Sequence, residues 1–272
     1  MSTDDVLLAA VRAHTRVLKL PTVARECETL GRQSLAEGWS PLQYLRALLD
    51  AELAVRAEHA IGRRMRAARL PVHKTMSQFD WRRPHGLERA RVEDLARGAW
   101  IPTARNIVIL GPVGTGKTHL AIALAIEAIK RGHHVLFYRA SDLVRALTEA
   151  RDARALSRLQ ERLRRVSLLV VDELGFVPFE KAGGELLFDV LSTRHERCAT
   201  VITSNLAFSE WNRVFVDDKL TAALLDRLAQ HAEVLVTRGP GDRVPAAATK
   251  KTDSRSDESK PKATQEVPAL TR

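Results

Sequence analysis

One short run decides the fold of this chain: Gly111-Pro-Val-Gly-Thr-Gly-Lys117-Thr118, which fits the pattern G-x-x-x-x-G-K-[ST] at every fixed position. An apolar stretch over residues 107–110 precedes the run, and another begins at His119. A strand, a glycine-rich loop and a helix in this order place backbone N–H groups around phosphates at a helix N-terminus. The run therefore predicts a phosphate-binding loop for ATP, in preference to a chance glycine turn.

The residue types of this loop suit separate tasks. Its glycines allow a tight turn, Lys117 is expected on the β- and γ-phosphates, and the Thr118 hydroxyl is expected to bind Mg²⁺. Nucleotide contacts are expected from the whole run and from the residue after it: Gly111, Pro112, Val113, Gly114, Thr115, Gly116, Lys117, Thr118 and His119.

Two acids, Asp172 and Glu173, follow an apolar run over residues 168–171 that predicts a central strand. Ligands of open α/β sheets bind at the carboxyl ends of the strands. Asp172 is therefore expected to hold Mg²⁺ through water, and Glu173 to orient and polarise the attacking water. A pair of helix-capping acids is the alternative, and the phosphate-binding loop upstream favours the catalytic interpretation.

A further apolar strand is predicted at residues 200–204, and it ends at Asn205. If this strand lies beside the strand of the phosphate-binding loop, Asn205 comes close to the γ-phosphate, where its amide could fix the attacking water. On these residues alone, an ordinary turn at the end of a strand is an equal alternative.

The first 75 residues read as a small helical domain. Pro21 opens one helix, and Ser40 is the predicted N-cap of a second whose first residue is Pro41. This second helix should run to about Arg69 and become strongly basic towards its end. Leucines recur in it at a spacing that makes one apolar stripe: Leu42, Leu45, Leu48, Leu49 and Leu53.

The rest of the chain alternates between apolar strands and amphipathic helices, which predicts an α/β fold with a parallel sheet covered by helices on both faces. We expect a helical N-terminal domain at 1–75, an ATPase domain at 76–243 and a disordered basic tail at 244–272. Strands are predicted at 107–110, 134–138, 168–171, 200–204 and 233–236, and helices from 117 and over 141–150, 153–165, 183–195 and 219–230.

Composition restricts the class of protein further. The 272 residues include no apolar run long enough to span a bilayer, so no membrane association is expected. The two cysteines, Cys27 and Cys198, lie far apart and form no metal-binding pair, which favours a reduced, cytoplasmic location. The net charge of +10 favours nucleic acid or another acidic surface as a partner.

The positive charge is concentrated in two segments. Residues 56–91 hold ten Lys and Arg against three acids, and residues 139–165 hold eight arginines against four acids. In the second segment Arg151, Arg154, Arg158, Arg162 and Arg165 would form one stripe on a single helix; a solvated helix paired with its own acids is the alternative. Such a stripe would bind duplex DNA through phosphates, largely without sequence preference. The DNA-binding candidates are Arg63, Arg64, Arg66, Arg151, Arg154 and Arg158.

Four runs together resemble one family: the loop with His119-Leu-Ala, Val171-Asp-Glu-Leu-Gly-Phe-Val-Pro178, Thr203-Ser-Asn-Leu-Ala-Phe-Ser-Glu-Trp211, and Leu224-Leu-Asp-Arg-Leu-Ala-Gln-His-Ala232. They resemble the IstB-like ATP-binding proteins. These are ATPase helpers of insertion-sequence transposases, related to DnaC-type helicase loaders within the AAA+ class. The resemblance covers residues 70–243 closely and the helical N-terminus more loosely.

The resemblance implies an AAA+ fold and Mg²⁺-dependent ATP hydrolysis. It places Asn205 at the sensor-1 position and Arg227 at the arginine finger, which enters the ATP site of a neighbouring subunit. A homo-oligomer with ATP at its subunit interfaces is therefore implied. The alternative for Arg227 is a surface arginine paired with Asp226.

Two other positions match the family less well. Arg243 falls where the family has a sensor-2-like arginine, but the run Gly239-Pro-Gly-Asp-Arg243 lacks the usual tyrosine, so it could equally begin the tail. The segment Phe79-Asp80-Trp81 resembles the aromatic segment of the family ahead of the ATPase core. It could line the adenine pocket or simply pack the linker.

The function expected from all these features is an ATP-dependent, DNA-binding helper of a cognate transposase. A replicative helicase loader is the first alternative, and the arginine-rich end of the N-terminal domain favours the transposition helper. A small-molecule kinase is disfavoured because Glu173 suits water activation and no acceptor-binding lid is evident.

Overall fold

A computed structural model describes residues 3–82, 86–215, 218–230 and 232–239 of the chain. The predicted disordered tail and Arg243 lie outside these residues. Among the described helices, none combines the length and the apolar character that a membrane span requires.

The N-terminal region consists of three helices, α1 (Thr3–Val17), α2 (Pro21–Glu37) and α3 (Pro41–Ala67). The predicted cap of α3 is confirmed: the Gln43 N–H donates to the Ser40 hydroxyl, and the Ser40 N–H donates to the Gln43 side chain. The helix ends close to the predicted position, where Arg69 takes a left-handed φ of 59°.

A buried carboxylate joins two of these helices. Glu52 of α3 accepts hydrogen bonds from the Thr22 and Val23 N–H groups at the start of α2, and a further one from the Arg56 side chain. Burial on its own raises the pKa of Glu52, but these three hydrogen bonds outweigh it and lower the pKa. A negative charge at a helix N-terminus also interacts favourably with the positive end of the helix dipole. Glu52 is therefore ionised and caps α2 from the neighbouring helix.

The leucine stripe of α3 is only partly used in packing. Leu48 is buried with Val23 and Cys27, whereas the other four leucines are exposed in the described part of the chain. The spacing correctly predicts a shared helix face, but a face is buried only where another element covers it.

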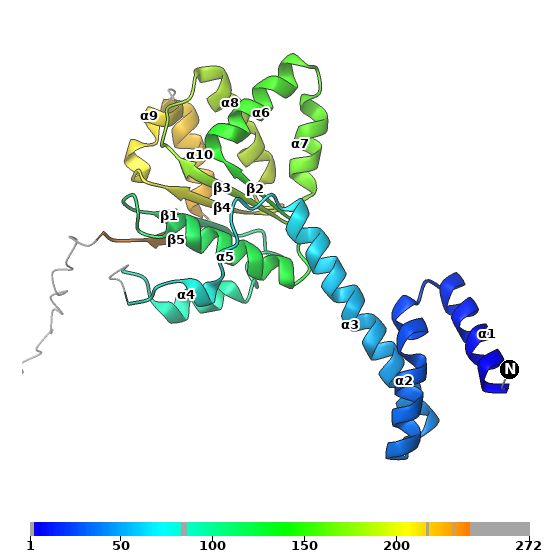
Figure 1. The fold of residues 1–272 in the computed structure, drawn as a ribbon. Coiled ribbons are helices and arrows are strands. Elements are labelled where there is room, and N and C mark those ends of the chain that lie inside the picture. Colours follow the sequence, from blue (N-terminus) through cyan, green and yellow to red (C-terminus); the bar gives the residue numbers. More distant parts are fainter. Residues whose placement is uncertain (1–2, 83–85, 216–217, 231, 240–272) are drawn as a thin grey trace, which may run out of the picture. The chain divides into compact units, whose positions relative to one another are not determined.

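The region after the linker is the predicted α/β structure (Figure 1). Its five strands are all parallel and have the order β2-β3-β4-β1-β5. The elements are α4 (Arg89–Ala96), β1 (Asn106–Leu110), α5 (Lys117–Lys130), β2 (Val135–Arg139), α6 (Ala140–Asp152), α7 (Leu156–Arg165), β3 (Leu168–Leu174), α8 (Lys181–Arg194), β4 (Ala199–Ser204), α9 (Asn212–Phe215), α10 (Asp218–Gln230) and β5 (Ala232–Val236).

The sheet is buried on both faces, as predicted. One core contains the apolar face of α5, whose Leu120 and Ile126 are fully buried against the strands. The other contains residues of α6, α8 and α10, among them Leu143 and Leu187. The strands are therefore nearly continuous apolar runs, and the polar residues of the predicted site lie at or near the ends of the strands.

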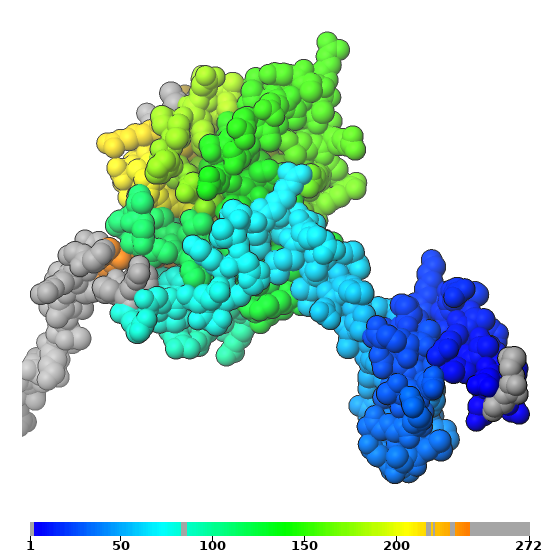
Figure 2. All heavy atoms as spheres, in the orientation of Figure 1, coloured from blue at the N-terminus to red at the C-terminus, as the bar shows by residue number. Residues whose placement is uncertain are grey.

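The helices predicted over residues 141–150 and 153–165 are both present, as α6 and α7, but the second begins three residues later than predicted. Helix α6 ends at Asp152, Arg154 takes a left-handed φ of 54°, and α7 begins only at Leu156. Figure 2 shows the connection between α6 and α7 at the surface. Arg151 and Arg158 consequently lie on different helices, and the predicted continuous arginine stripe does not exist.

Candidate nucleotide-binding site

The glycine-rich loop leaves β1 and enters α5 at Lys117, and all three of its glycines have positive φ. Gly111 has an additional reason to lack a side chain. A Cβ atom at this position would lie 2.2 Å from the backbone oxygen of Thr237, which is closer than atoms can approach. The first glycine of the motif is therefore required by a close contact as well as by its backbone conformation.

Thr237, just after β5, holds the loop in place. Its N–H donates to the Leu110 carbonyl over 2.7 Å, and its hydroxyl lies 2.6 Å from the hydroxyl of Thr115. Both threonines are buried. Thr237, which follows the last strand of the sheet, thus fixes the conformation of the loop.

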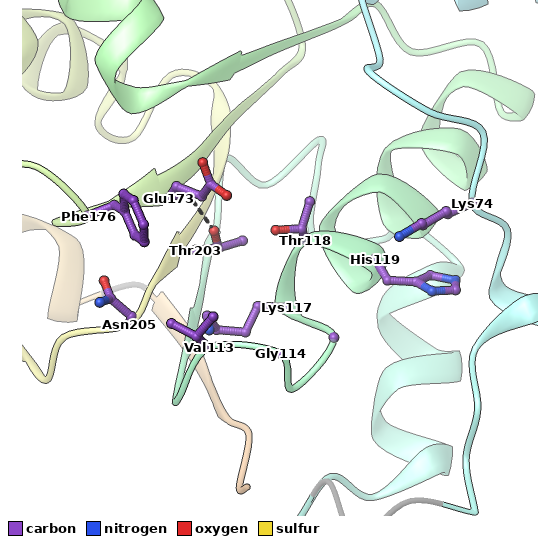
Figure 3. A pocket seen from close by; sticks show the side chains of 11 residues that line it. Lys74, Val113, Gly114, Lys117, Thr118, His119, Glu173, Phe176, Thr203 and Asn205 are labelled. Carbon is purple, nitrogen blue, oxygen red and sulfur yellow. Dashed lines mark hydrogen bonds between the residues drawn. The ribbon is translucent and has the colours of Figure 1, made fainter.

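A pocket of about 280 Å³ opens above this loop (Figure 3). Eight of the predicted site residues line it, together with three that were not predicted. The predicted ones are Val113, Gly114, Gly116, Lys117, Thr118, His119, Glu173 and Asn205; the others are Lys74, Phe176 and Thr203. The pocket wall therefore joins the loop, the ends of β3 and β4, and the linker before α4.

Lys117 is held at the mouth of the loop, where its Nζ donates to the Pro112 carbonyl over 2.7 Å. Burial lowers the pKa of Lys117, and the nearby carboxylates of Asp172 and Glu173 only partly oppose this. An ammonium group that burial disfavours gains from an anion placed beside it. A nucleotide's phosphates would supply that anion.

The residues that would hold Mg²⁺ are in contact with each other. The Thr118 hydroxyl donates to Asp172 Oδ1 over 2.9 Å, and the Asp172 carboxylate is buried behind it. A hydroxyl and a carboxylate are the hard oxygen ligands that Mg²⁺ uses together with phosphate oxygens. The two side chains therefore fit the predicted ion.

The paired acids lie within β3, not after it as the sequence predicted. The pairing of β3 with β4 passes from Val171 opposite Ile202 to Leu174 opposite Ser204, so two residues of β3 face one of β4. Within this bulge Glu173 takes a left-handed φ of 60°. Bulges re-aim side chains next to active sites. The Glu173 side chain lines the pocket and also pairs with Arg139 at 3.6 Å.

Asn205 follows β4, the direct neighbour of β1 in the sheet, as predicted. Its side chain lines the pocket, and its Oδ1 is buried without a hydrogen-bond partner among the described residues. A buried amide oxygen that lacks a partner is costly unless water or a ligand binds it. Of the two interpretations of Asn205, this geometry favours a residue that positions water. It disfavours an ordinary turn residue at the end of a strand.

Of the two alternatives for Phe79-Asp80-Trp81, the structure favours packing of the linker, because none of these residues lines the pocket. Phe79 is buried and packs edge-on against Trp81 and His119, with ring centroids 4.7 Å and 5.2 Å away. The linker residue that lines the pocket is Lys74. The carbonyl of the next residue, Thr75, is hydrogen-bonded to His119 Nε2. No motif marks an exposed lysine in a linker, so sequence reasoning missed it.

Arg227 lies apart from the pocket of its own chain. It is exposed on α10, and its guanidinium carbon is 5.5 Å from the centroid of the Phe188 ring. Arg227 is thus available at the surface, held over an aromatic ring.

This sheet order, the loop after β1 and the acids at β3 define a P-loop protein of the AAA+ class. Among solved structures, AMPPCP-bound DnaA from Aquifex aeolicus has a TM-score of 0.52 at 24% identity, over 62% of this chain and 51% of that one. The structure of DnaI has a TM-score of 0.51 at 19% identity, over 60% of this chain and 90% of that one. At these identities the likeness shows the fold.

The chain belongs to the IstB-like ATP binding protein family, whose sequence pattern matches residues 13–249. An insertion-sequence ATP-binding protein of Sinorhizobium fredii is 38% identical over 80% of this chain and 73% of its own. The corresponding IS21 protein of Pseudomonas aeruginosa is 34% identical over 84% of this chain and 86% of its own. The family predicted from the four sequence runs is therefore confirmed.

Proposed function

We propose that this protein is a Mg²⁺-dependent ATPase that binds duplex DNA and assists the transposase of an insertion sequence. One observation carries the proposal: groups suited to phosphate, metal and water meet in a single pocket of an insertion-sequence family member. Lys117 of α5, Glu173 of β3 and Asn205, which follows β4, line that pocket together.

Hydrolysis follows from the separate tasks of these groups. The loop N–H groups and Lys117 hold the β- and γ-phosphates, and Thr118 and Asp172 hold Mg²⁺. The bound ion supplies positive charge that offsets the charge of the phosphates. Asn205 orients a water molecule, and Glu173 accepts its proton as it attacks.

The arginines at the end of α3 are the better candidates for DNA contact. Arg63, Arg64 and Arg66 form no ion pair with the described residues. In the second basic segment, Arg164 and Arg165 are paired with Glu161, and Arg151 with Asp152. Arg154 and Arg158 form no ion pair among the described residues either, but the break between α6 and α7 separates Arg154 from the helix of Arg158. The three unpaired arginines of α3 share one continuous helix, so we assign the main DNA surface to α3, with Arg154 and Arg158 as secondary contacts.

Reversing charge at the end of α3 tests this assignment. The Arg63→Glu/Arg66→Glu variant should weaken binding to all duplex sequences alike. It should also flatten the slope of log affinity against log salt by about 0.9 for each phosphate that the protein no longer neutralises. Fluorescence anisotropy of labelled duplexes over a salt series measures both, and phosphate release with and without DNA tests the coupling to ATP. An Arg164→Glu/Arg165→Glu variant is the matched control.

An unchanged salt slope in the α3 variant, with ATP binding intact, contradicts the assignment to α3. Arg154→Glu/Arg158→Glu then tests the secondary surface. If DNA neither binds nor accelerates phosphate release by wild-type protein, the DNA-dependent function itself is wrong. The helicase-loader alternative has only the shared fold in its favour.

We further propose that Arg227 completes the ATP site of a neighbouring subunit. It is not among the residues that line its own pocket, and an exposed guanidinium can stabilise phosphate charge across an interface. ATPase rate should then rise faster than linearly with protein concentration. Mixing Arg227→Ala with Lys117→Ala subunits should restore activity, because some interfaces carry both intact residues. Wild-type activity of Arg227→Ala alone, or full activity of a monomer, contradicts the proposal.

A further inference from the structure

The hydroxyl of Thr203 lies between the two acids of the site. It donates to Asp172 Oδ1 over 2.5 Å and accepts from the Glu173 backbone N–H over 2.9 Å. Thr203 belongs to β4 and its side chain is 1% exposed, yet it borders the nucleotide pocket. Figure 3 shows the bond between Thr203 and Glu173 as a dashed line. Thr203 begins one of the four runs that resemble the family, but the sequence alone assigns it no role.

The Thr203 hydroxyl replaces a backbone hydrogen bond that is missing between β3 and β4. In the β3 bulge, Asp172 and Glu173 together face Thr203, so one backbone N–H of β3 loses its partner in the regular ladder. A hydroxyl has one donor and two acceptor positions. Thr203 uses its acceptor for the Glu173 N–H and its donor for the Asp172 carboxylate, so one group satisfies both sides of the bulge.

This arrangement holds Glu173 in an unfavourable backbone conformation. A non-glycine residue in the left-handed region is strained, and such residues persist where their surroundings hold them. Among the described residues, the side chain that binds the Glu173 backbone N–H is that of Thr203, through its hydroxyl. The direction in which the Glu173 carboxylate enters the pocket therefore depends on a hydroxyl that does not itself carry out chemistry.

We propose that Thr203 is a positioning residue for hydrolysis, acting through Glu173 and, secondarily, through Asp172. This inference rests on the proposed ATPase function. Loss of the hydroxyl should free the bulge to return to a regular strand conformation, which turns Glu173 away from the attacking water. The phosphate contacts of the loop, including Lys117, remain in place. Turnover should therefore suffer much more than ATP binding.

The test compares isosteric substitutions. Thr203→Val keeps the shape and removes the hydroxyl, and we expect its kcat to fall at least about 10-fold while its Kd for ATP changes less than about 3-fold. Thr203→Ser keeps the hydroxyl and should stay within about 3-fold of wild type. Thr200→Val, which removes a buried hydroxyl at the opposite end of β4, is the matched control and should retain kcat.

A double-mutant cycle separates positioning from a structural role. In a Glu173→Gln background, Thr203→Val should cost little more, because the group that it positions has already lost its function. Equal losses in both backgrounds overturn the inference, as does wild-type kcat in Thr203→Val. If the valine variant does not fold, Thr203→Cys, with its weakly bonding thiol, takes its place against Thr203→Ser.

The same measurements separate this inference from the proposed function. A strong effect of Glu173→Gln with none from Thr203→Val overturns the role of Thr203 and leaves the ATPase proposal standing. An absence of phosphate release by wild-type protein that binds ATP, with and without DNA, overturns both.

Discussion

A Glu173→Gln variant should bind ATP with an affinity within about 3-fold of wild type and yet lose about 10²- to 10⁴-fold in kcat, the range that general base catalysis contributes. The amide keeps the size of the carboxylate and can contact water, but it cannot accept a proton. The nucleotide remains held by the loop and Lys117, so binding and turnover separate.

Phosphate release and equilibrium nucleotide binding, measured on the same preparation, check this expectation. Glu180→Gln is a suitable control, because Glu180 is an exposed acid in the loop that follows β3 and lies outside the pocket lining. Normal turnover by Glu173→Gln would remove Glu173 from its role and would point to another base.

Lys117→Ala should lose ATP binding altogether at ordinary concentrations, with an affinity at least about 100-fold weaker. Hydrogen bonds to charged groups contribute about 1.5–3 kcal/mol each, and Lys117 is expected to make more than one. The alanine also removes one of the two donors to the Pro112 carbonyl and leaves only the Thr115 hydroxyl. Titration calorimetry measures the loss. Lys130→Ala removes an exposed lysine at the other end of α5 and should bind ATP normally.

The lowered pKa of Lys117 adds a pH dependence to this expectation. In the free protein burial favours the neutral amine, whereas bound phosphates favour the ammonium form. Binding of ATP at alkaline pH should therefore be accompanied by uptake of a proton. As the pH rises, the affinity for ATP should begin to decline at a lower pH than it would if the lysine had an ordinary pKa. If affinity stays constant over the alkaline range, or if Lys117→Ala binds ATP, Lys117 does not hold the phosphates.

The phosphate-binding loop could be predicted from the sequence because its ligands lie within one contiguous run. The strands were also predictable, since a strand buried on both faces is an apolar run with little polar interruption. Asp172 and Asn205 could be placed because parallel strands bring their carboxyl ends to one edge of the sheet. Each of these predictions depends on local pattern together with a simple rule of topology.

The features that were not predicted depend on contacts between distant segments. Thr203 acts through a bulge in the neighbouring strand, and Lys74 reaches the pocket because Thr75 is bound to His119. The exact position of the break between α6 and α7, which interrupts the arginine stripe, depends on a left-handed Arg154, and no neighbouring glycine or proline predicts that conformation. The exposure of the leucines in α3 likewise cannot be read from spacing alone.

The contact between Thr237 and the nucleotide loop also affects when the protein can begin to work. A chain emerges from the ribosome from its N-terminus, and Thr237 is made 127 residues after Leu110, to which it binds. Until then β1 lacks its neighbour β5, and Thr115 lacks its partner. A nascent chain with a complete glycine motif should therefore be unable to retain ATP. We therefore expect nucleotide binding only once β5 and Thr237 have been made, so ATP should not assist the folding steps that precede them during synthesis.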